Sequence, residues 1–279
     1  MRSKADIQQQ IIHAVDAARK AHPLTGSITN AVTMNLVANA QLAVGGSAAM
    51  VYLSEEGGIL AKLGDAFCIN VGTLLPLHEE SLPFTAKTLN EIGKPWVLDP
   101  VAVGIGSLRT HVLTQFKAYR PSIIRGNASE IIALAGLWKL EGGSGSNVRG
   151  VDSTDAVIAA KDAAVALARW TGGAVAVSGE TDLVTDGSIV VLSYGGSHFF
   201  EKITGSGCSL AGVVAVYAAV ATPFIAALSA TAIYNLAGYR AGQKAKGPGS
   251  FQVMFLDELY QAVATDIANN PFDIEECKQ

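Results

Sequence analysis

Charged residues are scarce in this chain of 279 residues. Only 16% are Asp, Glu, Lys or Arg, whereas folded proteins ordinarily carry about 25%. Lys plus Arg is 20 and Asp plus Glu is 24, so the formal net charge is −4 and there is no basic excess. This balance excludes nucleic acid and an anionic membrane as main partners. With 49% hydrophobic residues, the chain must hide much of its surface in thick layers or against other subunits.

Cysteine is nearly absent as well. Cys68, Cys208 and Cys277 are widely spaced and form no CxxC pair, which excludes a disulfide framework and a structural zinc site. The N-terminal residues lack the apolar segment of a secretory signal, so we expect a cytoplasmic protein. The phosphate-binding motif GxxxxGKS and the dinucleotide motif GxGxxG are also missing.

One long uncharged segment, residues 203–239, tests the exclusion of a membrane. It is long enough to cross a bilayer. However, it consists mostly of Ala, Gly, Ser and Thr, and Pro223 divides it. We therefore predict two buried helices that meet at Pro223, and no membrane span.

Short apolar runs alternate with amphipathic stretches along the chain. The runs lack a polar alternate face, which is typical of parallel strands covered by helices on both sides. The pattern predicts an α/β fold with strands at 48–53, 66–71, 96–99, 122–125, 174–178 and 199–203 and helices at 30–43, 77–92, 107–117, 128–134 and 153–170. Around residues 181–202 a turn at Thr185-Asp186-Gly187 predicts an antiparallel edge. The Gly-rich stretch 142–150 is either a plain linker or a mobile flap near a site.

Polar residues follow four of these predicted strands. They begin at Asp99, at Gly126-Asn127, at Gly179-Glu180 and at Thr204, where the sequence reads TGSGC. Ligands of such sheets bind beyond the carboxyl ends of the strands. Gly and Asn are also ordinary turn residues, and Asn127 could simply cap a helix.

The TGSGC segment, residues 204–208, opens the uncharged helix. Its glycines let backbone N–H groups face an anion at a helix N-terminus. Cys208 falls in the first turn, where we expect the helix dipole to lower the thiol pKa. The alternative is a buried structural cysteine at a tight turn.

Eight motifs in order resemble the hydroxyethylthiazole kinase family of the ribokinase-like superfamily. They span residues 28–252 and read ITNAVTMNLVANAQLAVGGSAAM, INVGTL, VLDPV, IRGNASEI, GVDS, AVSGETD, ITGSGCSL and KGPGSFQ. The resemblance implies one kinase domain over residues 1–279, folded as a three-layer α/β/α sandwich with a mostly parallel sheet and an antiparallel edge. It implies transfer of the ATP γ-phosphoryl, with Mg²⁺, to the primary hydroxyl of 4-methyl-5-(2-hydroxyethyl)thiazole in thiamine salvage. It also implies a homotrimer with the thiazole bound between subunits.

The resemblance assigns roles to particular residues. Related kinases end a GxGD motif with a catalytic Asp, and Cys208 stands in its place here. By the same resemblance the substrate contacts are Met50, Gly205 and Asn30, the ATP contacts are Arg125, Ser178 and Asn127, and the Mg²⁺ ligands, direct or through water, are Asp99 and Glu130.

Two positions depart from the family pattern. Gly26-Ser27 precedes ITN where the family has His-Asn, and Ala102 replaces a glycine of DPVGAG. These changes leave two further hypotheses open. The chain is a kinase for another small alcohol, or it is a nucleotide-binding regulator of the thiamine pathway with a degraded substrate pocket.

Overall fold

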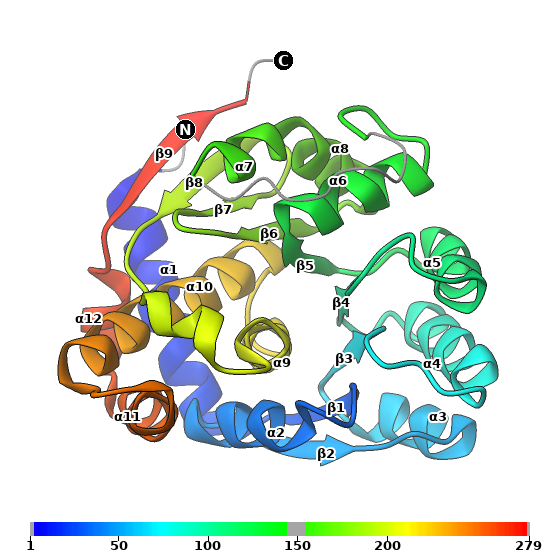
Figure 1. The fold of residues 1–279 in the computed structure, drawn as a ribbon, viewed down its shortest axis with the longest axis horizontal. Coiled ribbons are helices and arrows are strands. Elements are labelled where there is room, and N and C mark those ends of the chain that lie inside the picture. Colours follow the sequence, from blue (N-terminus) through cyan, green and yellow to red (C-terminus); the bar gives the residue numbers. More distant parts are fainter. Residues whose placement is uncertain (1–2, 144–153, 278–279) are drawn as a thin grey trace.

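The computed structural model describes residues 3–143 and 154–277, which contain one sheet of nine strands (Figure 1). The strand order is β2-β1-β3-β4-β5-β6-β7-β8-β9. The pairs from β2 to β6 are parallel, and β7, β8 and β9 add an antiparallel edge. The strands are β1 (Leu24–Ile28), β2 (Ser47–Met50), β3 (Ala66–Asn70), β4 (Trp96–Asp99), β5 (Ile123–Asn127), β6 (Ala174–Ser178), β7 (Asp182–Thr185), β8 (Ile189–Ser193) and β9 (Phe272–Glu276).

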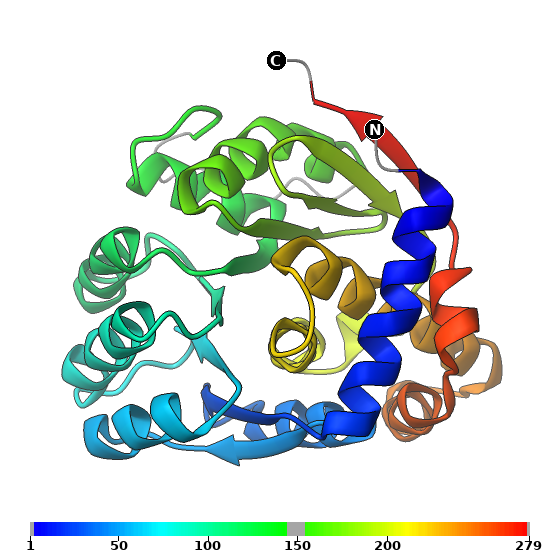
Figure 2. The same ribbon diagram turned by 180° about the vertical axis from the view of Figure 1, so that it is seen from behind.

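Helices cover both faces of this sheet (Figures 1 and 2). On one side of the sheet, α2 (Met34–Ala43), α9 (Ser206–Ala218) and α10 (Pro223–Lys244) contact the strands, and α1 (Lys4–Ala21), α11 (Pro248–Gln261) and α12 (Ala264–Ala268) pack against these helices. The other side packs against α3 (Ser54–Leu63), α4 (His78–Glu91), α5 (Ser107–Tyr119), α6 (Ala128–Leu137), α7 (Thr154–Ala159) and α8 (Lys161–Thr171). A 3₁₀ helix, η1 (His198–Lys202), precedes α9.

The central strands supply both hydrophobic cores. Along β3, Ala66 and Cys68 enter the core under α9, while Phe67 and Ile69 enter the core under α3 and α4. Every residue of β3 is buried, as the absence of a polar face predicts. The three-layer arrangement with a mostly parallel sheet and an antiparallel edge is therefore confirmed.

The uncharged segment forms two buried helices, as predicted. They are α9 and α10, and Pro223 is the first residue of α10, where its missing N–H leaves no helical bond unmade. Among the described residues, none of the helices combines the length and hydropathy that a bilayer crossing requires.

Several local expectations need correction. The segment 199–203 is not a strand, because η1 stacks Phe199 and Phe200 on Phe251 of α11. The predicted helix 153–170 is divided at Ala160 into α7 and α8 within its described part. The sequence patterns also missed β1, β9, α1 and α3. Of the predicted flap or linker at 142–150, residues 144–150 lie outside the described residues.

Candidate active site

Parallel strands β3, β4 and β5 end side by side and place polar side chains at one edge of the sheet. Asn70 pairs in register with Asp99, and Arg125 lies on the next strand. The Asn70 Nδ2 donates to Asp99 Oδ2 at 2.6 Å, and Arg125 Nη1 lies 3.9 Å from Asp99 Oδ1. Asp99 is fully buried and Arg125 is only 8% exposed. Such a buried charged pair at strand ends is costly to maintain, which points to a functional site.

The Arg125 guanidinium lies between the sheet and the start of α9. Its Nη2 donates to Ser178 Oγ at 2.7 Å, and a Cβ added to Gly207 would lie 2.4 Å from its Nη1. The buried Nε of Arg125 has no hydrogen-bond partner among the described residues. A planar guanidinium with donors left over suits phosphate oxygens.

The N-terminus of α9 faces this guanidinium and lacks a side-chain cap within the described structure. Gly205 is the N-cap with φ +93, and a Cβ there would lie 2.7 Å from Thr33 Cγ2, so glycine is required. The first bond of the helix runs from Ser209 N to Gly205 O. The N–H groups of Ser206, Gly207 and Cys208 therefore precede the helical bonds and form a cradle for an anion.

Cys208 lies in the first turn of α9 and is half-buried, with its Sγ 3.5 Å from Asn30 Nδ2. Burial, and then the nearby Asp99 carboxylate, raise the pKa of the Cys208 thiol. The expectation of a lowered pKa is therefore wrong, because desolvation and a like charge outweigh the helix dipole.

The N-terminus of α6 is built differently. Asn127 is its N-cap and accepts from Glu130 N at 2.9 Å, while Glu130 Oε2 accepts from Asn127 N at 2.9 Å. This reciprocal capping box uses two of the backbone donors at the start of α6, the N–H groups of Asn127 and Glu130. The other oxygen, Glu130 Oε1, accepts from Ala102 N at 3.2 Å and so ties the loop after Asp99 to α6.

The donor set around Asp99 fits a Mg²⁺ ion. Burial, together with the smaller effect of the nearby Glu130 and against the lowering effect of Arg125, raises the pKa of Asp99 to about 7. Asp99 Oδ1 is buried and accepts no hydrogen bond among the described residues, so it is available to a cation. The described residues contain no cluster of three or more His, Cys, Asp or Glu that would hold a metal unaided. Mg²⁺ commonly uses one or two carboxylates together with waters and substrate phosphates.

The structure places the three predicted substrate contacts in two locations. Asn30 and Gly205 lie beside Cys208. Met50 ends the edge strand β2 and is half-buried. The described contacts thus place two of the three predicted substrate residues at the cysteine.

The two departures from the family pattern also have defined places. Gly26 and Ser27 are buried in β1, where a Cβ on Gly26 would lie 2.4 Å from the ring of Phe67 and Ser27 Oγ accepts from Gln41 Nε2 at 3.1 Å. Their contacts are with the interior of the protein. Ala102 adopts φ +59, a left-handed conformation that favours glycine.

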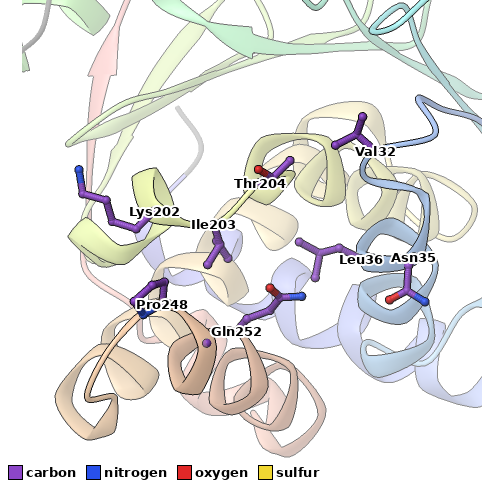
Figure 3. A pocket seen from close by; sticks show the side chains of 9 residues that line it. Val32, Asn35, Leu36, Lys202, Ile203, Thr204, Pro248 and Gln252 are labelled. Atoms are coloured by element: carbon purple, nitrogen blue, oxygen red, sulfur yellow. The ribbon is translucent and has the colours of Figure 1, made fainter.

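A groove of about 450 Å³ opens next to the start of α9 (Figure 3). It lies between α2, the segment from η1 to α9, and the start of α11. Its lining comprises Val32, Asn35, Leu36, Lys202, Ile203, Thr204, Pro248, Gly249 and Gln252. The KGPGSFQ motif therefore forms one wall of this groove, and Thr204 connects it to Gly205.

Asn70 is the site residue that the sequence patterns missed. It ends the apolar run of β3 and is followed by Val71-Gly72, as the other functional residues follow their strands. The signal was present but was read as part of the apolar run AFCINV.

Comparisons with known proteins agree with this geometry. Residues 15–265 match the model of the hydroxyethylthiazole kinase family. A hydroxyethylthiazole kinase of Bifidobacterium longum is 50% identical over 95% of this chain and 90% of the relative, and one of Cereibacter sphaeroides is 45% identical over 88% and 91%.

Solved structures give the same result. The structure of the hydroxyethylthiazole kinase protein from Pyrococcus horikoshii OT3 has a TM-score of 0.84 at 34% identity, and covers 97% of this chain and 100% of that one. The pyridoxal kinase from Staphylococcus aureus, in complex with AMP-PCP and pyridoxal, shares the fold alone, with a TM-score of 0.58 at 15% identity over 91% of this chain and 99% of that one. These likenesses confirm the ribokinase-like architecture, and the chain belongs to the hydroxyethylthiazole kinase family.

Proposed function

We propose that this protein transfers the γ-phosphoryl group of ATP to the primary hydroxyl of 4-methyl-5-(2-hydroxyethyl)thiazole, a reaction of thiamine salvage. The observation that carries the proposal is the uncapped N-terminus of α9, with Cys208 in its first turn and Arg125 opposite. Family membership supports the choice of substrate. Loose phosphoryl-transfer transition states need mainly positioning and neutralisation of negative charge, which this arrangement supplies.

The roles of the residues follow from their places. The N–H groups of α9 and the free donors of Arg125 bind the transferred phosphoryl, and Ser178 holds the Arg125 guanidinium in place. Cys208 orients the substrate hydroxyl, and in its thiolate form it takes the hydroxyl proton as the new oxygen–phosphorus bond forms. Because burial raises the pKa of the Cys208 thiol, the thiolate is the minor form at neutral pH, and the thiol must first lose its own proton to solvent before it can act as the base.

The remaining predicted residues contact either the thiazole alcohol or ATP and Mg²⁺. Asn30, Gly205 and Met50 contact the thiazole alcohol, and Asn127 contacts ATP through its side-chain N–H groups, since its Oδ1 caps α6. Asp99 would hold Mg²⁺ directly and Glu130 through water, because both Glu130 oxygens already accept backbone N–H groups. The ion, when bound, would neutralise charge on the phosphates.

We also propose a homotrimeric, cytoplasmic enzyme whose residues 1–279 form one kinase domain. One sheet joins strands from residue 24 to residue 276. Exposed apolar side chains concentrate in one part of the described chain, which suits a subunit interface: Leu53, Ile59, Leu63, Leu75, Leu77, Phe84 and Ile92. The three cysteines are unpaired, as in a reducing compartment.

An assay of phosphorylated product tests the substrate. Purified protein with ATP and MgCl₂ is offered the hydroxyethylthiazole beside a panel of small primary alcohols, and products are detected by mass spectrometry. We expect the thiazole phosphate to dominate. Faster turnover of another alcohol would favour the alternative kinase. Binding of ATP without any phosphorylated product would favour the regulator.

A further inference from the structure

The amide of Asn70 stands at the centre of a buried chain of hydrogen bonds. Its Nδ2 donates to Asp99 Oδ2 at 2.6 Å, and its Oδ1 accepts from Asn30 Nδ2 at 3.2 Å and from Gly72 N at 2.9 Å. Asn70 is 2% exposed, so these bonds are shielded from water. The chain links the carboxylate on β4 to Asn30, whose Nδ2 also lies 3.5 Å from Cys208 Sγ.

Two backbone N–H groups fix the direction of this chain. Gly72 N is a donor, so the Asn70 atom it faces must be the oxygen, and the Asn70 nitrogen is then turned to Asp99. Thr33 N donates in the same way to Asn30 Oδ1 at 3.2 Å, which turns the Asn30 nitrogen to Asn70 and Cys208. Neither amide can flip without placing a donor against a donor.

The consequence is an asymmetric Asp99 carboxylate. Oδ2 is held by Asn70, while Oδ1 accepts no hydrogen bond among the described residues and faces Arg125 Nη1 at 3.9 Å. The oxygen that remains free therefore lies on the side of the guanidinium and of the phosphate cradle. Without Asn70 the carboxylate could rotate about its last side-chain bond and lose that orientation.

We propose that Asn70 is a positioning residue for phosphoryl transfer, a role that rests on the kinase activity proposed above. It aims one oxygen of Asp99 at the nucleotide side, and through Asn30 it holds the amide that contacts Cys208 on the acceptor side. It touches neither ATP nor the thiazole. The Asn70 amide thus fixes both the Asp99 carboxylate on the ATP side and the Asn30 amide on the acceptor side.

Two substitutions separate this role from simple packing. Asn70→Asp keeps the shape and the acceptor for Gly72 N but replaces the donor to Asp99 with an oxygen. Asn70→Ser removes both contacts. Outer partners of metal-binding carboxylates are worth about 10–100-fold in activity or metal affinity when removed. We expect kcat to fall about 10–100-fold in both variants, with the KM for the thiazole nearly unchanged.

A second readout does not depend on turnover. Binding of Mn²⁺ to the protein–ADP complex, followed by electron paramagnetic resonance, should weaken by about 10–100-fold in the same variants. Asn270→Ser is the matched control, because Asn270 is 6% exposed and donates to Tyr194 O and Ser193 Oγ on the β8 side of the sheet. It should lose thermal stability without losing kcat or Mn²⁺ affinity.

The possible outcomes separate the positioning role of Asn70 from the proposed kinase activity. Wild-type kcat and Mn²⁺ affinity in a folded Asn70→Asp or Asn70→Ser protein would overturn the positioning role, while an inactive wild type would instead defeat the proposed function. If neither variant folds, a crystal structure of the wild type decides. Asn70 Nδ2 within hydrogen-bonding distance of Asp99 Oδ2 supports the role, and a flipped or separated amide overturns it.

Discussion

Two helices begin at the same edge of the sheet, and their first turns are opposites. In α6 the side chains of Asn127 and Glu130 cap the backbone, so two of its N-terminal donors, the N–H groups of Asn127 and Glu130, are used internally. In α9 the cap is Gly205, no side-chain cap is described, and the donors of the first turn remain free. Both helices follow an apolar run, and both starts are rich in small or polar residues.

From this difference we expect the start of α9, rather than that of α6, to bind the transferred group. A capped N-terminus is a device of stability and an uncapped one is open to an anion. The chain thus uses α6 to anchor the loop after Asp99, through the bond from Ala102 N to Glu130. It leaves α9 open opposite Arg125. The variants below test whether the two helix starts differ in function.

Removing the thiol of α9 should have the largest effect. We expect Cys208→Ala to lower kcat by about 10²–10⁴-fold, the usual worth of a positioned acid–base group. Cys208→Asp should retain much of the activity, because a carboxylate can also accept the hydroxyl proton. Steady-state kinetics measure both, with Cys277→Ala, just after β9, as the control. Full activity in Cys208→Ala would contradict the role of the thiol.

Adding a side chain at Gly207, beside the N–H groups at the start of α9, should have the next largest effect on activity. In Gly207→Ala the new Cβ would lie 2.4 Å from Arg125 Nη1 and 3.0 Å from its Cζ, which displaces the guanidinium. We expect kcat to fall about 100-fold, since misplacing a positioning group by about 1 Å has that effect.

The control is Gly249→Ala, because Gly249 is likewise the second residue of a helix with a glycine cap and its Cβ would meet nothing within 4 Å. That variant should keep its activity. Equal kinetics for the two alanine variants would show that the space beside Arg125 is irrelevant.

Weakening the cap of α6 should give a smaller, mixed effect. Glu130→Gln leaves one oxygen for the N–H groups of Ala102 and Asn127, so we expect a loss of about 1 kcal/mol in the free energy of unfolding. Activity should fall about 10-fold through the weakened hold on Mg²⁺. Chemical denaturation measures the free energy of unfolding, and steady-state kinetics measure the activity.

The chain offers a matched capping box in α1, where Ser3 and Asp6 cap each other. Asp6→Asn should lower the melting temperature without changing kcat. If Glu130→Gln behaves like Asp6→Asn, Glu130 is a cap alone and its metal role is wrong.

The smallest effect should be at Ala102. Its left-handed conformation, φ +59, strains a residue with a Cβ. We expect Ala102→Gly to raise the free energy of unfolding by about 1 kcal/mol with kcat unchanged. Ala17→Gly within α1 is the opposite control and should lower it by about 1 kcal/mol. Thermal denaturation measures both, and a destabilised Ala102→Gly would refute the strain.

The sequence predicted the parts whose signals are local. Apolar runs gave the central strands, and Pro223 with the lack of charge gave α9 and α10. Motif order gave the family, and the site residues that it names stay predictions. The strand β1 was missed because its Gly26 and Ser27 look like turn residues, and only the ring of Phe67 explains why a glycine belongs there.

Long-range contacts account for the other errors. The segment at Phe199 and Phe200 has strand composition, yet stacking on α11 makes it a 3₁₀ turn. The pKa of Cys208 was predicted from its helix alone, whereas burial and Asp99, which lies 109 residues earlier in the chain, decide its direction. Asn70 stands at the end of an apolar run, but its partners Asp99 and Gly72 are identified only by the structure.

The central claim is that the open start of α9 holds the group in transfer. A crystal structure with ADP, MgCl₂, the hydroxyethylthiazole and tetrafluoroaluminate, a mimic of the transferred phosphoryl, tests it most directly. We predict fluorine atoms at about 3 Å from the N–H groups of Gly207 and Cys208, with Arg125 on the opposite side. Tetrafluoroaluminate bound at the start of α6, or away from both helices, would contradict it.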